Sequence, residues 1–184
     1  WFLAPIAWIP LFMALNNTSL RASFRLGVLH GFLSFGATLW WLLEIFGTLA
    51  PALWLMLALF TGIFSMAFHF ARRFQTKWFP VIIATVWTGI EYYRCELFTL
   101  SFPWITPGTG FPPNILTSVI GVYGVTFVII LLSTSLTNLT AGKRLLDQIS
   151  LTCAYLILII PLFANYAWPF SEPAIEVALI QNEE

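Results

Sequence analysis

Long apolar stretches alternate along the chain with short polar segments that hold most of its charges. A helix that crosses a bilayer needs about 20 apolar residues, within a range of about 17–25. On this criterion the pattern predicts six transmembrane helices, at about residues 1–15, 26–43, 50–71, 78–93, 115–137 and 149–167. The predicted fold class is therefore an all-α polytopic membrane bundle that occupies residues 1–170.

Composition supports an integral membrane protein. Of the 184 residues, 59% are hydrophobic and 9% are charged, whereas soluble domains carry about 25% charged residues. The net charge is zero, so nothing in the charge balance favours nucleic acid as a partner. The two cysteines, Cys95 and Cys153, lack CxxC spacing, so we predict no metal site, disulfide framework or cofactor.

The basic residues predict the orientation of the bundle. Seven of the eight lie on one side of the six-helix arrangement, namely Arg21, Arg25, Arg72, Arg73, Lys77, Lys143 and Arg144. The positive-inside rule makes that side cytoplasmic and leaves Arg94 on the other side. Both chain ends then lie outside the cytoplasm. Because residues 1–15 lack the basic start of a signal peptide, we expect one more helix upstream.

The segment 88–114, TGIEYYRCELFTLSFPWITPGTGFPPN, is the least lipid-like apolar region. Glu91 and Arg94 stand three residues apart at a helix end and can pair, which would offset the cost of charge at membrane depth. The Pro/Gly-rich part is predicted to be an irregular loop. One interpretation makes this pair a helix cap and Trp104 an interface anchor. The other places Arg94 near a lipid phosphate.

Neither cysteine is predicted to be a nucleophile. Cys95 is followed by a glutamate, which disfavours the thiolate, and Cys153 lies inside an apolar run, where a cysteine behaves as a small hydrophobe. His30 and His69 are expected to face neighbouring helices rather than to act as bases.

One block of this segment resembles a known family. The stretch WTGIEYYRCELFTLSFPWITPG is similar to the membrane-domain signature of bacterial apolipoprotein N-acyltransferases. The matching positions are Trp87, Glu91, Arg94, Phe102, Pro103, Trp104 and Gly108. RLGVLHGFLSFGATLWWL and GVYGVTFVIILLSTSL also resemble family helices, and IEVALIQNEE resembles the first strand of the family's nitrilase-like domain. Ser101, Thr109 and Asn182 depart from the usual Gly, Tyr and Gly.

The resemblance implies a domain organisation. In this family a membrane bundle carries an outward-facing αββα nitrilase-like domain, inserted before the final helix. We therefore expect residues 171–184 to begin that extracytoplasmic domain with the first β-strand, the rest of the domain being absent from this chain. The chain is also expected to start after the family's first helix.

The resemblance also implies a function. The family moves an acyl chain from a phospholipid donor to the N-terminal diacylglyceryl-cysteine of a lipoprotein acceptor. A Glu, Lys and Cys triad of the nitrilase-like domain would form a thioester, which splits one difficult step into two. No catalytic residue is assigned in this chain, which is expected to be inactive alone. The location implied is the bacterial cytoplasmic (inner) membrane, with the C-terminal end of the chain periplasmic.

The candidate residues are Glu91, Arg94, Phe102, Pro103 and Trp104. We expect the charged pair to form the outer floor of a lipid cleft. The other three would pack under the catalytic domain or against an acyl chain.

Three alternatives remain open. One is a non-catalytic membrane subunit or degenerate homologue, and another is a transferase with a different outer domain. The third is a small transporter, which would show charges in mid-span or matching broken helices in two halves.

Overall fold

The computed structural model describes residues 4–74, 76–110 and 115–140, and this part of the chain is helical without a strand. Its elements are α1 (Ala4–Ala7), α2 (Ile9–Ala14), η1 (Leu15–Asn17), α3 (Leu20–Thr38), α4 (Leu42–Phe46), η2 (Gly47–Leu49), α5 (Ala50–Arg72), α6 (Phe79–Tyr92), η3 (Tyr93–Leu97), η4 (Pro107–Gly110) and α7 (Ile115–Thr140). The predicted span 149–167 and the predicted strand at 175–181 lie outside the described residues.

The helices α5 and α6 follow the predicted ranges 50–71 and 78–93 closely. Each has a proline in its first turn, where the missing N–H costs no hydrogen bond. The helix α7 begins where expected, but Gly121, with φ 67° and ψ 179°, interrupts it. Two segments of the described chain, Leu42–Arg72 and Thr117–Asn138, are long and apolar enough to cross a bilayer. The other predicted crossings stay predictions.

The first two predicted spans need correction. Residues 4–17 form α1, α2 and η1 instead of one helix, and α2 starts at a proline-containing turn, since proline cannot continue a helix from the preceding turn. The predicted span 26–43 is displaced, because α3 begins at Leu20 and ends at Thr38. The Ser19 side chain accepts a hydrogen bond from the Ala22 N–H, at 3.4 Å, and caps α3 at this earlier point.

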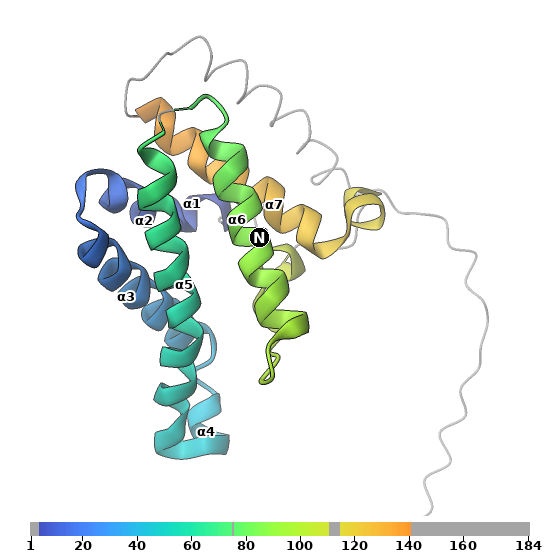
Figure 1. Cartoon of the computed structure of the whole chain (residues 1–184). Coiled ribbons are helices and arrows are strands. Elements are labelled where there is room, and N and C mark those ends of the chain that lie inside the picture. The colour runs from blue at the N-terminus through green and yellow to red at the C-terminus, as the bar shows by residue number, and fades with distance from the viewer. Residues whose placement is uncertain (1–3, 75, 111–114, 141–184) are drawn as a thin grey trace, which may run out of the picture.

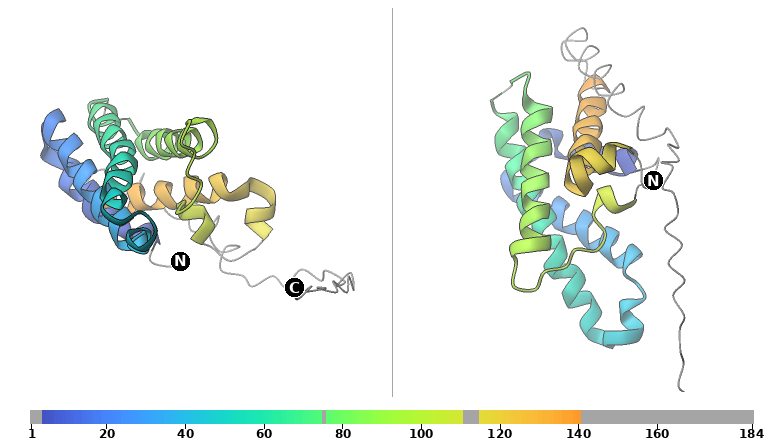
Figure 2. Two further views of the ribbon diagram at one scale, coloured as in Figure 1. Left: turned by 90° about the horizontal axis from the view of Figure 1, so that it is seen from below. Right: turned by 90° about the vertical axis from the view of Figure 1, so that its right-hand side faces the viewer.

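The long helices α3 and α5 lie side by side and run in opposite directions, joined at one end through α4 (Figure 1). The helix α6 packs on α7, which crosses behind it at a steep angle in Figure 1 and runs across it in the left view of Figure 2. Small residues allow α3 and α5 to approach closely, because Gly27 and Gly31 are buried against Thr61 and Ser65. Gly27 and Gly31 are four residues apart, and small residues at this spacing are typical of helix contacts within membranes.

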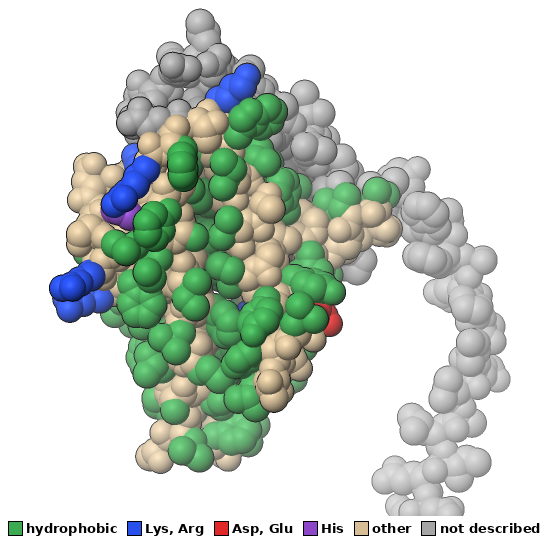
Figure 3. All heavy atoms as spheres, in the orientation of Figure 1, with side chains coloured by type: hydrophobic (Ala, Val, Ile, Leu, Met, Phe, Trp, Pro, Cys, Tyr) green, Lys and Arg blue, Asp and Glu red, His purple; other side chains and the backbone are tan. Residues whose placement is uncertain are grey.

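Two apolar clusters hold the bundle together. The first lies where α2, α5, α6 and α7 meet and contains Phe12, Phe64, Phe68, Ile83, Trp87, Val125 and Ile129. The second lies near α4 and contains Phe35, Leu39, Leu42, Ala50, Trp54 and Leu57. The outward sides of the long helices are also apolar, as the predominantly hydrophobic surface in Figure 3 shows. Such a surface suits contact with lipid chains.

We predict that Gly31→Val destabilises the contact between α3 and α5, because a Cβ at Gly31 would lie 2.8 Å from the Cα of Ala58. Overpacking of this kind costs about 1–3 kcal/mol. The full-length protein in detergent should therefore unfold at a lower temperature. Gly89→Val is the matched control, since a Cβ at Gly89 meets nothing within 4 Å. Equal melting temperatures for the two variants would contradict the prediction.

Candidate functional site

The site begins where α6 ends. After Tyr92 the chain continues into η3, a wider turn of π-helix, in which the Phe98 N–H donates to the Tyr93 carbonyl at 2.8 Å. Such turns occur frequently at functional sites. Glu91 in the last turn of α6 is 0% exposed, and Arg94 in η3 is 2% exposed. The sequence therefore buries two charged side chains at the end of one helix.

Arg94 holds the loop that follows. Its guanidinium donates to the carbonyl of Phe102 at 2.8 Å and to that of Trp104 at 3.3 Å. The Phe102 N–H returns a hydrogen bond of 3.4 Å to the Arg94 carbonyl. The guanidinium also lies over the ring of Phe35, at 5.9 Å from its centroid, which adds a cation–π contact. Arg94 thus ties the loop to both α6 and α3.

Glu91 holds the far end of the same loop through a third residue. The Thr126 hydroxyl donates to the Glu91 carboxylate at 3.1 Å and accepts the Gly108 N–H at 3.0 Å. A hydroxyl can donate and accept at once, so this side chain on α7 connects α6 with η4. All three residues are buried. Glu91 and Arg94, which their spacing allows to pair, form hydrogen bonds with different partners: Arg94 with the loop carbonyls and Glu91 with Thr126.

Glycine at position 108 is required by the close approach of η4 to α7. A Cβ there would collide with the carbonyl oxygen of Val122. The same proximity brings the Gly108 N–H within reach of Thr126. The sequence did not lead us to predict a role for Thr126. The feature that could have indicated it is a threonine hydroxyl within the apolar run GVYGVTFVIILL.

The three loop candidates lie on the other side of this network. Phe102 packs against the cluster near α4, while Pro103 is exposed. Trp104 is 54% exposed and stacks on Trp41, with ring centroids 5.5 Å apart. The structure therefore places all five candidates in one region of the molecule, but they differ in how far they are exposed. The charged pair is buried beneath the loop, and Pro103 and Trp104 are open to a ligand or another domain.

Exposed apolar side chains surround this end of the bundle. We call this set the apolar rim, and it consists of Trp40, Ile45, Leu49, Leu97, Leu100 and Trp104. The rim extends over α4, η2, η3 and the loop, which lie at the same end of the molecule (Figure 1). Tryptophans among aliphatic side chains are typical of the membrane–water interface.

The remaining candidate groups have ordinary structural surroundings. Cys95 is buried, with its Sγ 3.7 Å from the Phe102 carbonyl, and burial raises the pKa of its thiol. The His30 ring lies against Trp8, and His69 is 3.2 Å from a nitrogen of Arg73. Within the described ranges no group of His, Cys, Asp and Glu side chains could hold a metal ion.

Helices with lipid-compatible surfaces around a buried polar network define a helical membrane-protein domain. The family profile described as the Apolipoprotein N-acyltransferase N-terminal domain matches residues 1–135. The chain therefore belongs to the apolipoprotein N-acyltransferase family, as its signature block predicted.

Curated relatives agree with this assignment. The chain is 27% identical over 157 residues to an apolipoprotein N-acyltransferase from Geobacter metallireducens, covering 76% of this chain and 30% of the relative. It is 32% identical over 124 residues to that from Caulobacter vibrioides, covering 59% and 23%. It is 37% identical over 89 residues to that from Haemophilus ducreyi, covering 46% and 17%. The chain thus spans less than a third of these relatives, and no solved structure matches it.

We predict that Thr126→Val lowers the thermal stability of the full-length protein in detergent. Valine keeps the shape but leaves the buried Glu91 oxygen and the Gly108 N–H without the hydroxyl, at a cost of about 1–3 kcal/mol. Thr126→Ser should retain most of the stability. Thr85→Val is the matched control, because the Thr85 hydroxyl is exposed and bonds only to its own helix, at the Val81 carbonyl. An effect no larger than that of the control would count against the network.

We also predict slow alkylation of Cys95. Its raised pKa reduces the thiolate fraction at pH 7, and burial restricts access. A cysteine introduced by Leu100→Cys is the control, because Leu100 is 61% exposed on the same loop. N-ethylmaleimide should modify it at least about tenfold faster than Cys95, measured peptide by peptide with mass spectrometry. Equal rates would show that Cys95 is accessible and reactive.

Proposed function

We propose that this chain is the membrane portion of an N-acyltransferase. The complete enzyme would move an acyl chain from a phospholipid to the N-terminal diacylglyceryl-cysteine of a lipoprotein. The observation that carries this proposal is the family match over residues 1–135, together with three curated relatives that are named apolipoprotein N-acyltransferases. The thioester chemistry belongs to the nitrilase-like domain, which we place after residue 170.

The proposed location is the bacterial inner membrane, with several crossings. The positions of the described basic residues support this orientation. They lie near the start of α3, at the end of α5 and just before α6, and they are Arg21, Arg25, Arg72, Arg73 and Lys77. Figure 3 shows Lys and Arg side chains along the upper and left margins of the molecule, away from α4. By the positive-inside rule this end is cytoplasmic. The apolar rim and the loop then lie on the periplasmic side, where the catalytic domain would sit.

The buried network gives the loop a defined shape in this proposal. Arg94 holds the carbonyls of Phe102 and Trp104, and Thr126 links Glu91 to Gly108. A loop held at both ends loses little further freedom when a ligand or domain binds to it, which lowers the cost of binding. We assign Glu91 and Arg94 a positioning role, because their side chains are buried.

The exposed part of the loop is the proposed contact surface. Pro103 and Trp104 would pack under the catalytic domain or against the acyl chain of the donor lipid. Trp104 is supported from behind by Trp41, so its ring is held in place without being covered. A rigid aromatic side chain with a large open surface is well suited to this role, since it gains contact area for little lost freedom.

We predict that Arg94→Ala slows lipoprotein acylation by the full-length enzyme about tenfold or more, because a displaced loop misplaces the bound groups. Arg94→Lys should recover only part of the rate, since lysine lacks the planar fork that spans two carbonyls. The measurement uses proteoliposomes with a phospholipid donor and a diacylglyceryl lipopeptide, whose mass increases on acylation.

Arg73→Ala is the matched control, because Arg73 is an exposed arginine at the opposite end of the bundle. An unchanged rate in Arg94→Ala, with normal accumulation, would overturn the positioning role alone. A wild-type full-length protein that does not acylate the lipopeptide would instead overturn the proposed function and favour a non-catalytic homologue.

A further inference from the structure

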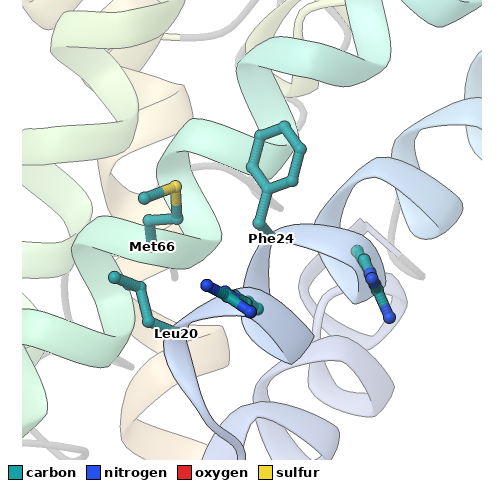
Figure 4. A pocket seen from close by; sticks show the side chains of 5 residues that line it. Leu20, Phe24 and Met66 are labelled. Atoms are coloured by element: carbon teal, nitrogen blue, oxygen red, sulfur yellow. The ribbon is translucent and has the colours of Figure 1, made fainter.

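A recess lies at the basic end of the bundle, away from the loop. It has a volume of about 300 Å³ and is lined by Leu20, Phe24 and Met66, together with Arg21 and Arg25. Figure 4 shows Leu20, from the first turn of α3, beside Met66 on α5, with Phe24 one turn further along α3. We call this recess the α3–α5 groove. Its size is at the lower limit of ordinary ligand sites.

The floor of the groove is apolar. Leu20 and Phe24 stand four residues apart, so they lie on one face of α3, and Met66 completes the surface from α5. All three side chains are half-buried. A flexible methionine beside an aromatic ring adapts readily to chains of different shape. This floor fits a hydrocarbon segment and offers nothing to a polar ligand.

The edge of the groove is cationic. Arg21 and Arg25 are exposed and stand one turn apart on α3. Neither forms an ion pair with another described residue, and the described acids Glu44, Glu91 and Glu96 belong to α4, α6 and η3 at the other end. The guanidinium fork matches the geometry of a phosphate group.

The position of these arginines is unfavourable for the isolated helix. Two like charges at i and i+4 repel each other. Arg21 also lies in the first turn of α3, where the helix dipole favours an anion rather than a cation. Topology requires positive charge at this end but does not require two arginines beside an apolar groove. A bound anion would offset both unfavourable terms.

We propose that the α3–α5 groove binds an anionic phospholipid. Its phosphate lies between Arg21 and Arg25, and the upper part of an acyl chain lies along Leu20, Phe24 and Met66. Anionic lipids are favoured over zwitterionic ones because the two arginines that line the groove, Arg21 and Arg25, have no acidic partner among the described residues. This site is separate from the donor lipid of acyl transfer and does not depend on that reaction.

Native mass spectrometry of the full-length protein in detergent tests the proposal, with phosphatidylglycerol and phosphatidylcholine of identical acyl chains as probes. The wild type should bind phosphatidylglycerol more tightly. Arg21→Gln combined with Arg25→Gln should raise its apparent Kd about tenfold or more. Arg72→Gln combined with Arg73→Gln is the matched control, since it removes the same charge beside the groove and should have a much smaller effect.

Two further measurements separate a lipid from a free anion. Met66→Gln leaves both arginines in place and should weaken phosphatidylglycerol binding several-fold. Inorganic phosphate at millimolar concentration should displace little of the bound lipid. Equal effects of the two double variants, no preference for phosphatidylglycerol, or complete displacement by phosphate would each overturn the proposal. If the glutamine pair does not insert, Arg21→Lys with Arg25→Lys keeps the charge and should still weaken binding.

Discussion

The structure of this domain depends on the burial of two opposite charges at the end of one apolar helix. A buried charge is tolerated only when hydrogen bonds replace its water. Here one guanidinium nitrogen of Arg94 donates to two backbone carbonyls of the following loop, and one carboxylate oxygen of Glu91 accepts the Thr126 hydroxyl. The Glu91 Oε2 and the Arg94 Nε are buried without a hydrogen-bond partner among the described residues, so the loop contacts offset only part of the cost of burial. These requirements give an otherwise irregular segment a single arrangement. The loop is therefore ordered by polar contacts, while the helices around it are held mainly by apolar packing.

The two kinds of interaction also divide the molecule by function. Apolar packing at the small residues Gly27 and Gly31 sets the distance between α3 and α5. The polar network sets the position of η4 relative to α6 and α7. Between them stands the Trp41–Trp104 stack, which joins the region of α4 to the loop. In the enzyme we propose, the first set of contacts supports the bilayer-facing body and the second supports the working surface.

The continuous apolar runs were the most predictable part of the fold. The ranges of α5 and α6 could be derived from the sequence because nothing interrupts those runs and a proline marks each start. Residues 4–14 are as apolar, but the turn containing Pro10 divides them into the short helices α1 and α2. The helix α3 starts earlier than predicted, at the Ser19 cap, because a capped helix can extend beyond an apolar run into residues that include Arg21 and Arg25.

Much less of the site could be derived. The spacing of Glu91 and Arg94 indicated that they could pair, but spacing within a helix says nothing of carbonyls that arrive from a loop. The role of Thr126 depends on α7 packing against α6, which involves residues more than thirty positions apart. Family resemblance identified Gly108 as a matching position, and only the packing of η4 on Val122 explains why a side chain is excluded there.

The close contact of α3 with α5 has a mechanical consequence. Side chains of each helix pack over the glycines of the other, as Phe24 and Val28 do around Gly62. Neither helix can therefore move along its partner without steric overlap. A change in bilayer thickness is commonly absorbed by tilt. In this protein the two helices would have to tilt together as a rigid unit, and the α4 region at one end of that unit would move with them. Membrane thickness would thereby act directly on the height of Trp41 and of the tryptophan stacked on it.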